Sequence, residues 1–435
     1  MPRSADHVLS DYFVTLAPFT DTKVSSKVSH FCEEHPEMGN KPEPSPLHAR
    51  SIRGIGLLTS LTTLFVGLFA GQAGGQTLKV LYNFGGGSDG GDPYATMTRD
   101  AAGNLYSTVD YGGTNFAGGV FKVAPSGAET MLYSFTGGAD GAYPFSSVVR
   151  DSAGNLYGTT SMGGSANSGV VFKVDSSGTE TVLHNFTGGA DGLTPIGGLV
   201  RDKNGNLYGT TSQGGTANRG ILFKIGPHGK ETILHTFVGG TTDGQYPSYT
   251  DLLMDAQGTL YGVTEEGGAA NGGIVYKLTQ SNRFTILHSF MGGTTDGCNV
   301  LGTPFMDKAG TIYGTTSSCG TSSLGTVWKL LKNGKESVLH SFAGGTTDGE
   351  YPLAGVLVDA AGNLYGNTET GGTANFGTIY KISKTGKETL VHSFNGTDGK
   401  FPYGTFVQNP KGTLLFGTTQ NGGSIGYGTV WKIKK

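Results

Sequence analysis

The chain has 435 residues, of which 76 are glycine and only 14% are charged, and its net charge is −3. Soluble proteins ordinarily contain about 7% glycine and about 25% charged residues, so this composition is typical of a turn-rich β protein. The composition does not suit a disordered chain, because Val, Leu, Ile, Tyr and Phe recur at strand-like intervals. The lack of a basic excess argues against nucleic acid as a partner.

The first 76 residues stand apart from the rest of the sequence. Residues 1–49 are polar and aperiodic, and we interpret them as a disordered extension or a mis-assigned start, since Met38 would begin an ordinary leader. Two arginines then precede an uncharged run at 54–71 that ends in small residues, which predicts a secretory signal peptide over residues 50–73. The alternative is a membrane anchor, for which the run is short. We expect a secreted or cell-surface protein with no membrane span in its mature chain.

From residue 77 onward, one motif repeats seven times. Two landmarks recur every 50 to 53 residues. One is an Asp-Gly dipeptide, whose aspartates are Asp89, Asp140, Asp191, Asp243, Asp296, Asp348 and Asp398. The other is a lysine after an aromatic residue, at Lys122, Lys173, Lys224, Lys277, Lys329, Lys381 and Lys432.

Each period predicts four short strands. In the second copy these are 144–151, 156–160, 170–174 and 179–186, joined by short turns and by a longer loop that opens with Gly-Gly. Runs of β-branched and aromatic residues between turn residues specify antiparallel hairpins. A repeated four-stranded unit of about 50 residues predicts a β-propeller blade.

The two ends of the repeat region complement each other. The last copy stops after its third strand at 428–434, whereas an extra fourth strand, 77–84, precedes the first copy. Pairing these strands would complete a seventh blade and remove free sheet edges that invite aggregation. The sequence therefore predicts that residues 77–435 form an all-β, seven-bladed β-propeller with four antiparallel strands per blade, closed by the N-terminal strand.

The compound motif resembles a known repeat. Its pattern, P-x-x-x-L-V-x-D-x-x-G-N-L-Y-G-T-T-x-x-G-G followed by G-T-V-F-K and V-L-H-S-F-x-G-x-x-D-G, looks like the GloVer tandem repeat of bacterial surface and secreted proteins. The resemblance covers residues 77–435 and implies an exported protein, often tethered by a C-terminal anchor, with no agreed activity. This chain departs from that pattern, since it ends at Lys435 inside a strand. A weaker resemblance is to kelch blades.

Residues that recur in every copy favour a structural role. One place in the fourth strand holds His in five copies and Tyr in two, namely His184, His235, His288, His340, His392, Tyr82 and Tyr133. A His that exchanges with Tyr suits packing or hydrogen bonding, and histidines spread around a ring do not converge on a metal. The Asp-Gly aspartates suit tight turns, with calcium binding as the alternative. We predict no metal and no cofactor.

Function is better sought where the repeat breaks. We expect the Asp-Gly loops and the Gly-Gly loops to line one rim, which is the more variable face. Most copies carry a neutral polar residue just before Gly-Gly, whereas charge and aromaticity appear there at Asp110, Tyr111, Glu265, Glu266 and Glu369. These five are the ligand-binding candidates, with solvated surface charges as the alternative. No catalytic residue is assigned.

Two functional hypotheses remain. In the first, the protein is a non-catalytic exported module, expected to be a monomer, that binds a polysaccharide or a surface protein on its loop face. In the second, it is a polysaccharide lyase or glycoside hydrolase with its site at the mouth of the central channel. An enzyme needs an asymmetric cluster of converging groups. The sequence shows more repetition than asymmetry, so we favour binding.

The two cysteines of the repeat region are predicted to form a disulfide. Cys298 follows the Asp-Gly of the fifth copy, and Cys319 replaces the first glycine of the same copy's Gly-Gly loop. Both loops belong to one rim of one blade, and export permits the bond. The alternative is two free or buried thiols.

Overall fold

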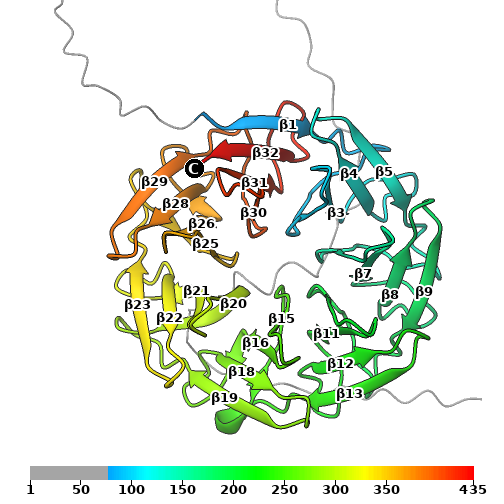
Figure 1. Cartoon of the computed structure of the whole chain (residues 1–435), viewed down its shortest axis with the longest axis horizontal. Helices are drawn as coiled ribbons and strands as arrows, with labels where there is room; N and C mark the ends of the chain where they lie inside the picture. Colours follow the sequence, from blue (N-terminus) through cyan, green and yellow to red (C-terminus); the bar gives the residue numbers. More distant parts are fainter. Residues whose placement is uncertain (1–76) are drawn as a thin grey trace, which may run out of the picture. The chain divides into compact units, whose positions relative to one another are not determined.

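A computed structural model describes residues 77–435, which form a ring of seven four-stranded antiparallel sheets (Figure 1). Each sheet is one blade, and the predicted fold class is confirmed. The predicted signal peptide at 50–73 and the extension at 1–49 lie outside the described residues. Within residues 77–435, no helix has the length and apolarity needed to cross a bilayer.

The four strands of each blade are ordered from the centre of the ring outward. We number the blades in chain order from the sheet that begins with β2. The first strands are β2 (Thr98–Arg99), β6 (Val149–Arg150), β10 (Val200–Arg201), β15 (Leu253–Met254), β20 (Gly297–Met306), β25 (Leu357–Val358) and β30 (Val407–Gln408). The second strands are β3 (Leu105–Val109), β7 (Leu156–Thr160), β11 (Leu207–Thr211), β16 (Leu260–Thr264), β21 (Ile312–Cys319), β26 (Leu364–Thr368) and β31 (Leu414–Thr419). The third strands are β4 (Gly119–Val123), β8 (Val170–Val174), β12 (Ile221–Ile225), β18 (Ile274–Leu278), β22 (Thr326–Leu330), β28 (Thr378–Ile382) and β32 (Thr429–Lys434). The outermost strands are β5 (Glu129–Ser134), β9 (Glu180–Asn185), β13 (Glu231–Thr236), β19 (Phe284–Ser289), β23 (Glu336–Ser341), β29 (Glu388–Ser393) and, in blade seven, β1 (Lys79–Asn83).

Blade seven joins the two ends of the repeat region. Strand β1 pairs antiparallel with β32, placing Lys79 opposite Lys432 and Asn83 opposite Thr429. Figure 1 shows β1 lying outside β32. The predicted closure by the N-terminal strand is therefore confirmed.

Except in blade five, where β20 spans Gly297–Met306, the innermost strand is shorter than predicted. In blade two it covers only Val149–Arg150, because the preceding segment leaves the sheet and contacts neighbouring blades instead. In blades six and seven, the backbone N–H groups of Gly355 and Thr405 donate to Thr405 Oγ1 and Thr96 Oγ1, at 3.0 Å each. Small side chains permit this approach: a Cβ on Gly355 would lie 2.0 Å from a neighbouring backbone oxygen. The inner segments thus meet directly around the centre.

The hydrophobic core lies between adjacent blades. One phenylalanine at the end of each outer strand is fully buried, at Phe84, Phe135, Phe186, Phe237, Phe290, Phe342 and Phe394. Phe186 of blade two, for example, packs with Leu199 and Phe223 of blade three. Because each core needs two blades, the ring depends on its closure.

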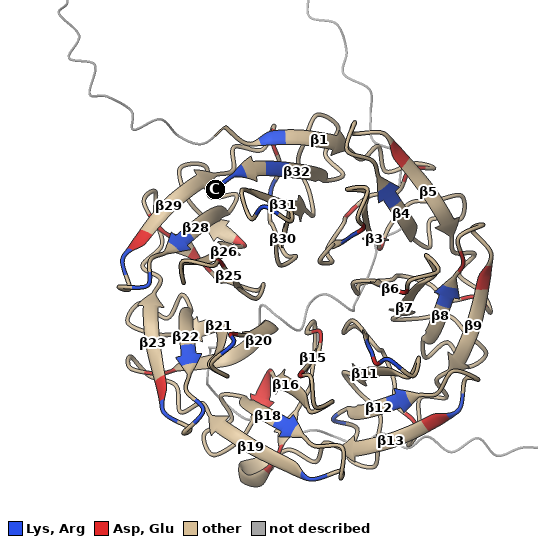
Figure 2. Cartoon of the chain, in the orientation of Figure 1, with Lys and Arg blue, Asp and Glu red and all other residues tan. Residues whose placement is uncertain are grey.

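The Asp-Gly and Gly-Gly loops share one rim, as expected. In blades four and six they form the two-stranded pairs β14 (Gly244–Gln245) with β17 (Glu266–Gly267), and β24 (Gly349–Glu350) with β27 (Thr370–Gly371). A 3-10 turn, Gly240–Thr242, precedes β14. Single bridges such as Gly91 to Tyr111 make the same connection elsewhere. Figure 2 shows basic and acidic residues distributed around the ring.

Candidate functional site

Seven equivalent positions lie near the ends of the second strands at this rim, and we call each one the rim position. They are Asp110, Ser161, Ser212, Glu265, Ser317, Glu369 and Gln420. In blades two, three and five the serine hydroxyl donates to a carbonyl oxygen of its own blade, as Ser161 Oγ does to Tyr143 O at 3.0 Å. These three positions are therefore satisfied internally.

In blades six and seven the rim position contacts the next blade. The hydroxyl of Tyr403 donates to Glu369 Oε1 at 2.7 Å, and Gln420 Nε2 donates to the hydroxyl of Tyr94. The rings of Tyr94 and Tyr403 lie 5.1 Å apart between centroids, and Tyr94 also packs on Phe145 of blade two at 5.3 Å. A chain of polar and aromatic contacts thus runs from blade six to blade two.

Asp110 is the unsatisfied member of this group. Its Oδ1 atom is buried and has no hydrogen-bond partner. Burial, and next the carboxylate of Asp92, raise its pKa well above the ordinary value. Burial, and next the charge of Asp110, likewise raise the pKa of Tyr94. The raised pKa favours the neutral carboxylic acid, the form of this side chain that can donate a hydrogen bond.

We call Asp92, Tyr94, Asp110, Glu369, Tyr403 and Gln420 the central cluster. Three exposed or half-buried aromatic side chains lie beside it, and we call them the aromatic platform: Tyr111, Phe116 and Tyr427. The ring of Tyr111 is stacked on that of Tyr427 at 6.1 Å with 9° between planes, and lies 5.7 Å from Phe116. Phe116 is 54% exposed and Tyr427 is 38% exposed. Aromatic rings left open to solvent suit stacking against a ligand.

Phe116 replaces a residue that stabilises the loop in other blades. Its φ is +56°, in the left-handed region, where four other copies carry asparagine. In blade two, for example, Asn167 Oδ1 accepts the N–H of Gly163 at 2.9 Å. Phenylalanine is strained in this conformation and gives up that hydrogen bond, and such local costs cluster at functional sites.

An open groove adjoins the central cluster on the side of blade six. It has a volume of about 600 Å³ and is lined in part by Phe376, Lys400, Phe401, Asn421 and Ile425. The ammonium of Lys400 lies 4.4 Å from the ring centre of Phe376. Asn421 Nδ2 also donates to Asp92 Oδ1 at 3.0 Å, so the groove and the central cluster are continuous.

The structure brings three of the five predicted site residues together and sets two apart. Asp110, Tyr111 and Glu369 belong to the surface formed by blades six, seven and one. Glu266 Oε2 instead accepts from Gln245 Nε2 at 2.7 Å and from Asn271 Nδ2 at 3.3 Å. Burial, and next Glu266, raise the pKa of Glu265 to about 7. Within residues 77–435 neither glutamate hydrogen-bonds to a member of the central cluster.

Three residues of the inner segments were not predicted from the sequence: Tyr94 and Tyr403, which follow the inner proline, and Asp251. Asp251 Oδ1 accepts the N–H of Gly198 at 2.8 Å, and its Oδ2 accepts the hydroxyl of Ser147 at 2.9 Å. Burial raises the pKa of Asp251. The signal was present, because the other copies carry only Thr, Ser or Gly at this place.

In five of the seven blades, the His or Tyr of the outer strand hydrogen-bonds to the Asp-Gly aspartate that follows it. The Tyr82 hydroxyl donates to Asp89 Oδ2 at 2.8 Å, and His392 Nε2 lies 2.8 Å from Asp398 Oδ2. Blade five also carries a covalent link, at the rim of the Asp-Gly and Gly-Gly loops. Cys298 and Cys319 are joined as a disulfide between β20 and β21, with Cα atoms 5.4 Å apart.

Fold and rim define the class: a seven-bladed propeller whose long loops build one asymmetric surface. The chain belongs to the Gloeobacter/Verrucomicrobia repeat family, whose model matches residues 66–254 and 201–431. The resemblance that the motif indicated is thereby confirmed. No curated protein matches the sequence.

Solved structures show the same fold at low identity. A streptogramin B lyase structure is similar with a TM-score of 0.55 and 12% identity, over 83% of this chain and 98% of that one. Virginiamycin B lyase from Staphylococcus aureus is similar with a TM-score of 0.51 and 10% identity, over 80% of this chain and 96% of that one. At such identities the likeness establishes the fold alone.

Proposed function

We propose that this protein is an exported, non-catalytic carbohydrate-binding propeller whose site lies on the rim over blades six, seven and one. The observation that carries the proposal is the aromatic platform. Tyr111 and Tyr427 present stacked rings, and Phe116 is exposed in a backbone conformation that other copies give to asparagine. Sugar rings stack on such surfaces through their apolar faces.

The polar surroundings of the platform support a carbohydrate rather than a purely apolar partner. Asp92 and Asn421 lie between the platform and the groove, and Asp110 keeps an unpaired buried oxygen. Hydroxyl groups of a sugar both donate and accept, so they satisfy amide, carboxylate and protonated carboxyl groups together. A groove of about 600 Å³ extends this surface, which suits a ligand longer than one sugar unit.

The second candidate function is a polysaccharide lyase or glycoside hydrolase. One observation favours it, namely that the raised pKa of Asp110 beside Tyr94 is what a general acid requires. The two similar proteins are both lyases, but the likeness at 10–12% identity is one of fold. The enzyme hypothesis therefore rests on Asp110.

The test is a panel of immobilised polysaccharides scored for retention of the protein and for release of soluble products. We expect retention on at least one polysaccharide without product. If wild type releases product and Asp110→Asn does not, while both are retained equally, the enzyme hypothesis replaces the binding hypothesis. No retention on any member would overturn the carbohydrate proposal and favour a protein ligand.

A further inference from the structure

Every junction between blades repeats one arrangement on the outside of the ring, which we call the outer seam. It contains the His or Tyr of one outer strand, the Asp-Gly aspartate that follows it, and the residue that begins the next blade's outer strand. In five seams this last residue is a glutamate: Glu129, Glu180, Glu231, Glu336 and Glu388.

In five of the seven seams, the His or Tyr contacts the Asp-Gly aspartate directly. Tyr133 donates to Asp140 Oδ2 at 2.9 Å. His235 Nε2 lies 3.1 Å from Asp243 Oδ1, and its ring stacks on Phe284, which replaces the glutamate, at 3.8 Å. Direct pairing is therefore the ordinary state of this seam.

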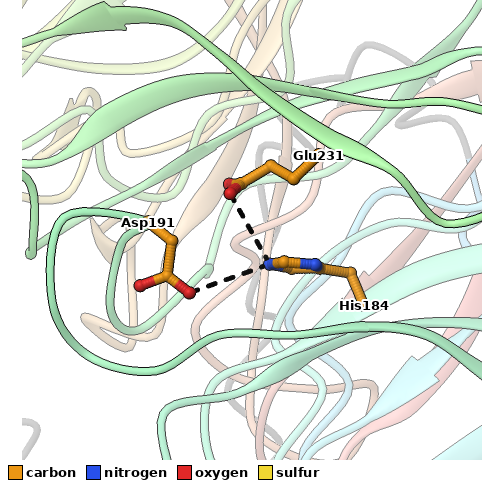
Figure 3. Close-up of side chains that lie close together, drawn as sticks. All are labelled: His184, Asp191 and Glu231. Carbon is orange, nitrogen blue, oxygen red and sulfur yellow. Dashed lines mark ion pairs between the residues drawn. The ribbon is translucent and has the colours of Figure 1, made fainter.

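The seam between blades two and three does not close in this way. His184 Nε2 lies 4.0 Å from Asp191 Oδ2 and 3.9 Å from Glu231 Oε2, and all three side chains point toward one another (Figure 3). His184 Nε2 is buried and has no hydrogen-bond partner, whereas the equivalent atoms of His235, His340 and His392 have one. Glu231 Oε1 is also unpaired, as is the Oε1 atom of every seam glutamate. Unpaired buried polar atoms are costly, so a missing partner is indicated here.

The seam between blades four and five is the second such place. His288 Nε2 lies 3.4 Å from Asp296 Oδ2, and Glu336 completes the set. His288 Nε2 and Glu336 Oε1 are likewise buried without hydrogen-bond partners. In each of the two seams, the three ligand atoms lie within 4.8 Å of one another.

We propose that these two seams are metal sites, each holding one Zn²⁺ between adjacent blades. One imidazole nitrogen and two carboxylate oxygens form a zinc ligand set, which leaves room for a water as the fourth ligand. Two atoms that each lie about 2.1 Å from one ion are at most about 4.2 Å apart. The distances from His184 Nε2 to Asp191 Oδ2 and Glu231 Oε2 fall within this limit. The two carboxylates lie within 4.8 Å of each other, so movements below about 1 Å bring all three atoms within reach of one ion.

The expectation of no metal rested on comparing histidines with one another around the ring. The ligands instead converge within one seam, from two blades. A bound ion would therefore cross-link the blades. Ca²⁺ is a poor match, because it takes six to eight oxygen ligands and the seam supplies an imidazole nitrogen.

The experiment measures zinc retained by the full chain after removal of metal with a chelator, loading with Zn²⁺ and gel filtration. Wild type is expected to retain two more zinc ions than the double variant His184→Tyr/His288→Tyr, and each single variant one fewer than wild type. Tyrosine suits the place because Tyr133 pairs with Asp140 in an equivalent seam. Zn²⁺ should raise the melting temperature of wild type and leave that of the double variant unchanged.

The matched control is His235→Tyr, in the seam that has Phe284 in place of glutamate, and it should retain as much zinc as wild type. Equal zinc content in wild type and the double variant, with both folded by circular dichroism, would overturn the proposal. Stabilisation by Ca²⁺ but not by Zn²⁺ would overturn it as well.

Discussion

Blades one and four both break the repeat at the same two rim places, with different results. In blade four, Glu266 accepts from Gln245 and Asn271, and Asn271 keeps the loop hydrogen bond to Gly267. In blade one, Tyr111 joins an open aromatic platform and Asp110 keeps an unpaired oxygen. A departure from the repeat therefore indicates binding only where the surrounding structure leaves the side chain unsatisfied or exposed.

Blade one also lies beside the blade that the two ends of the repeat region complete, so the largest effect is expected from breaking that closure. Deleting residues 74–85 removes β1 and the buried Phe84 and exposes the edge of β32. We expect the melting temperature to fall by more than about 10 °C, since losing a buried phenylalanine alone costs about 3–5 kcal/mol. Calorimetry checks this, with Lys79→Ser as the control. An unchanged melting temperature would refute closure as a source of stability.

The next largest loss of stability is expected in blade five. There Cys319 replaces the first glycine of the Gly-Gly loop and forms a disulfide with Cys298. Cys298 and Cys319 enclose a short loop, and such a bond contributes roughly 3 kcal/mol in the chain-entropy model. Cys298→Ser/Cys319→Ser should therefore lower the free energy of unfolding by about that amount. Thiol titration of the unfolded, unreduced protein provides the independent check. Two free thiols in the repeat region would show that the bond is absent.

Asp251 is a departure from the repeat in blade four that supports the fold. Asp251→Ala leaves the N–H of Gly198 and the hydroxyl of Ser147 without their acceptor, which should cost about 1–3 kcal/mol. Asp251→Asn keeps an acceptor for Gly198 and should lie close to wild type. Urea unfolding distinguishes them. If the alanine variant is as stable as wild type, Asp251 is not structural.

The smallest effect is a pH dependence of the outer seams. Burial, and next the Asp-Gly aspartate, raise the pKa of each outer-strand glutamate, including Glu129 and Glu231, from 4.5 to about 7. A folded-state pKa above the unfolded value contributes stability at low pH that is lost as pH rises through about 7. Replacing all five by glutamine should therefore flatten the fall in melting temperature between pH 5 and pH 8, with chelator present. A steeper fall in the variant would contradict the assignment.

The fold followed from the sequence because its determinants are local and repeated. Turn glycines, alternating strands and the complementary ends at 77–84 and 428–434 are all visible along the chain. The candidate site followed only in part. Asp110, Tyr111 and Glu369 stood out from the repeat, but Tyr94 and Tyr403 look like ordinary inner-segment residues until the blades are placed side by side.

Contacts between blades explain the remaining misses. The length of the first strand depended on hydrogen bonds between inner segments, such as that of Gly355 to Thr405, which no single copy reveals. The seam at His184 likewise needs Glu231 from the next blade. Sequence reasoning within one repeat identifies positions, whereas the ring decides which positions meet.

Restoring the repeat on the aromatic platform tests whether this rim is the binding site. Tyr111→Thr and Phe116→Asn introduce the residues of blade six, and Tyr427→Ala removes the stacked partner. The triple variant should keep the wild-type melting temperature and bind the polysaccharide retained by wild type at least about tenfold more weakly, since about 1.4 kcal/mol corresponds to a factor of ten. Met162→Thr, at the equivalent place on blade two, should bind as wild type does. Undiminished retention of the triple variant would contradict the assignment of this rim as the binding site.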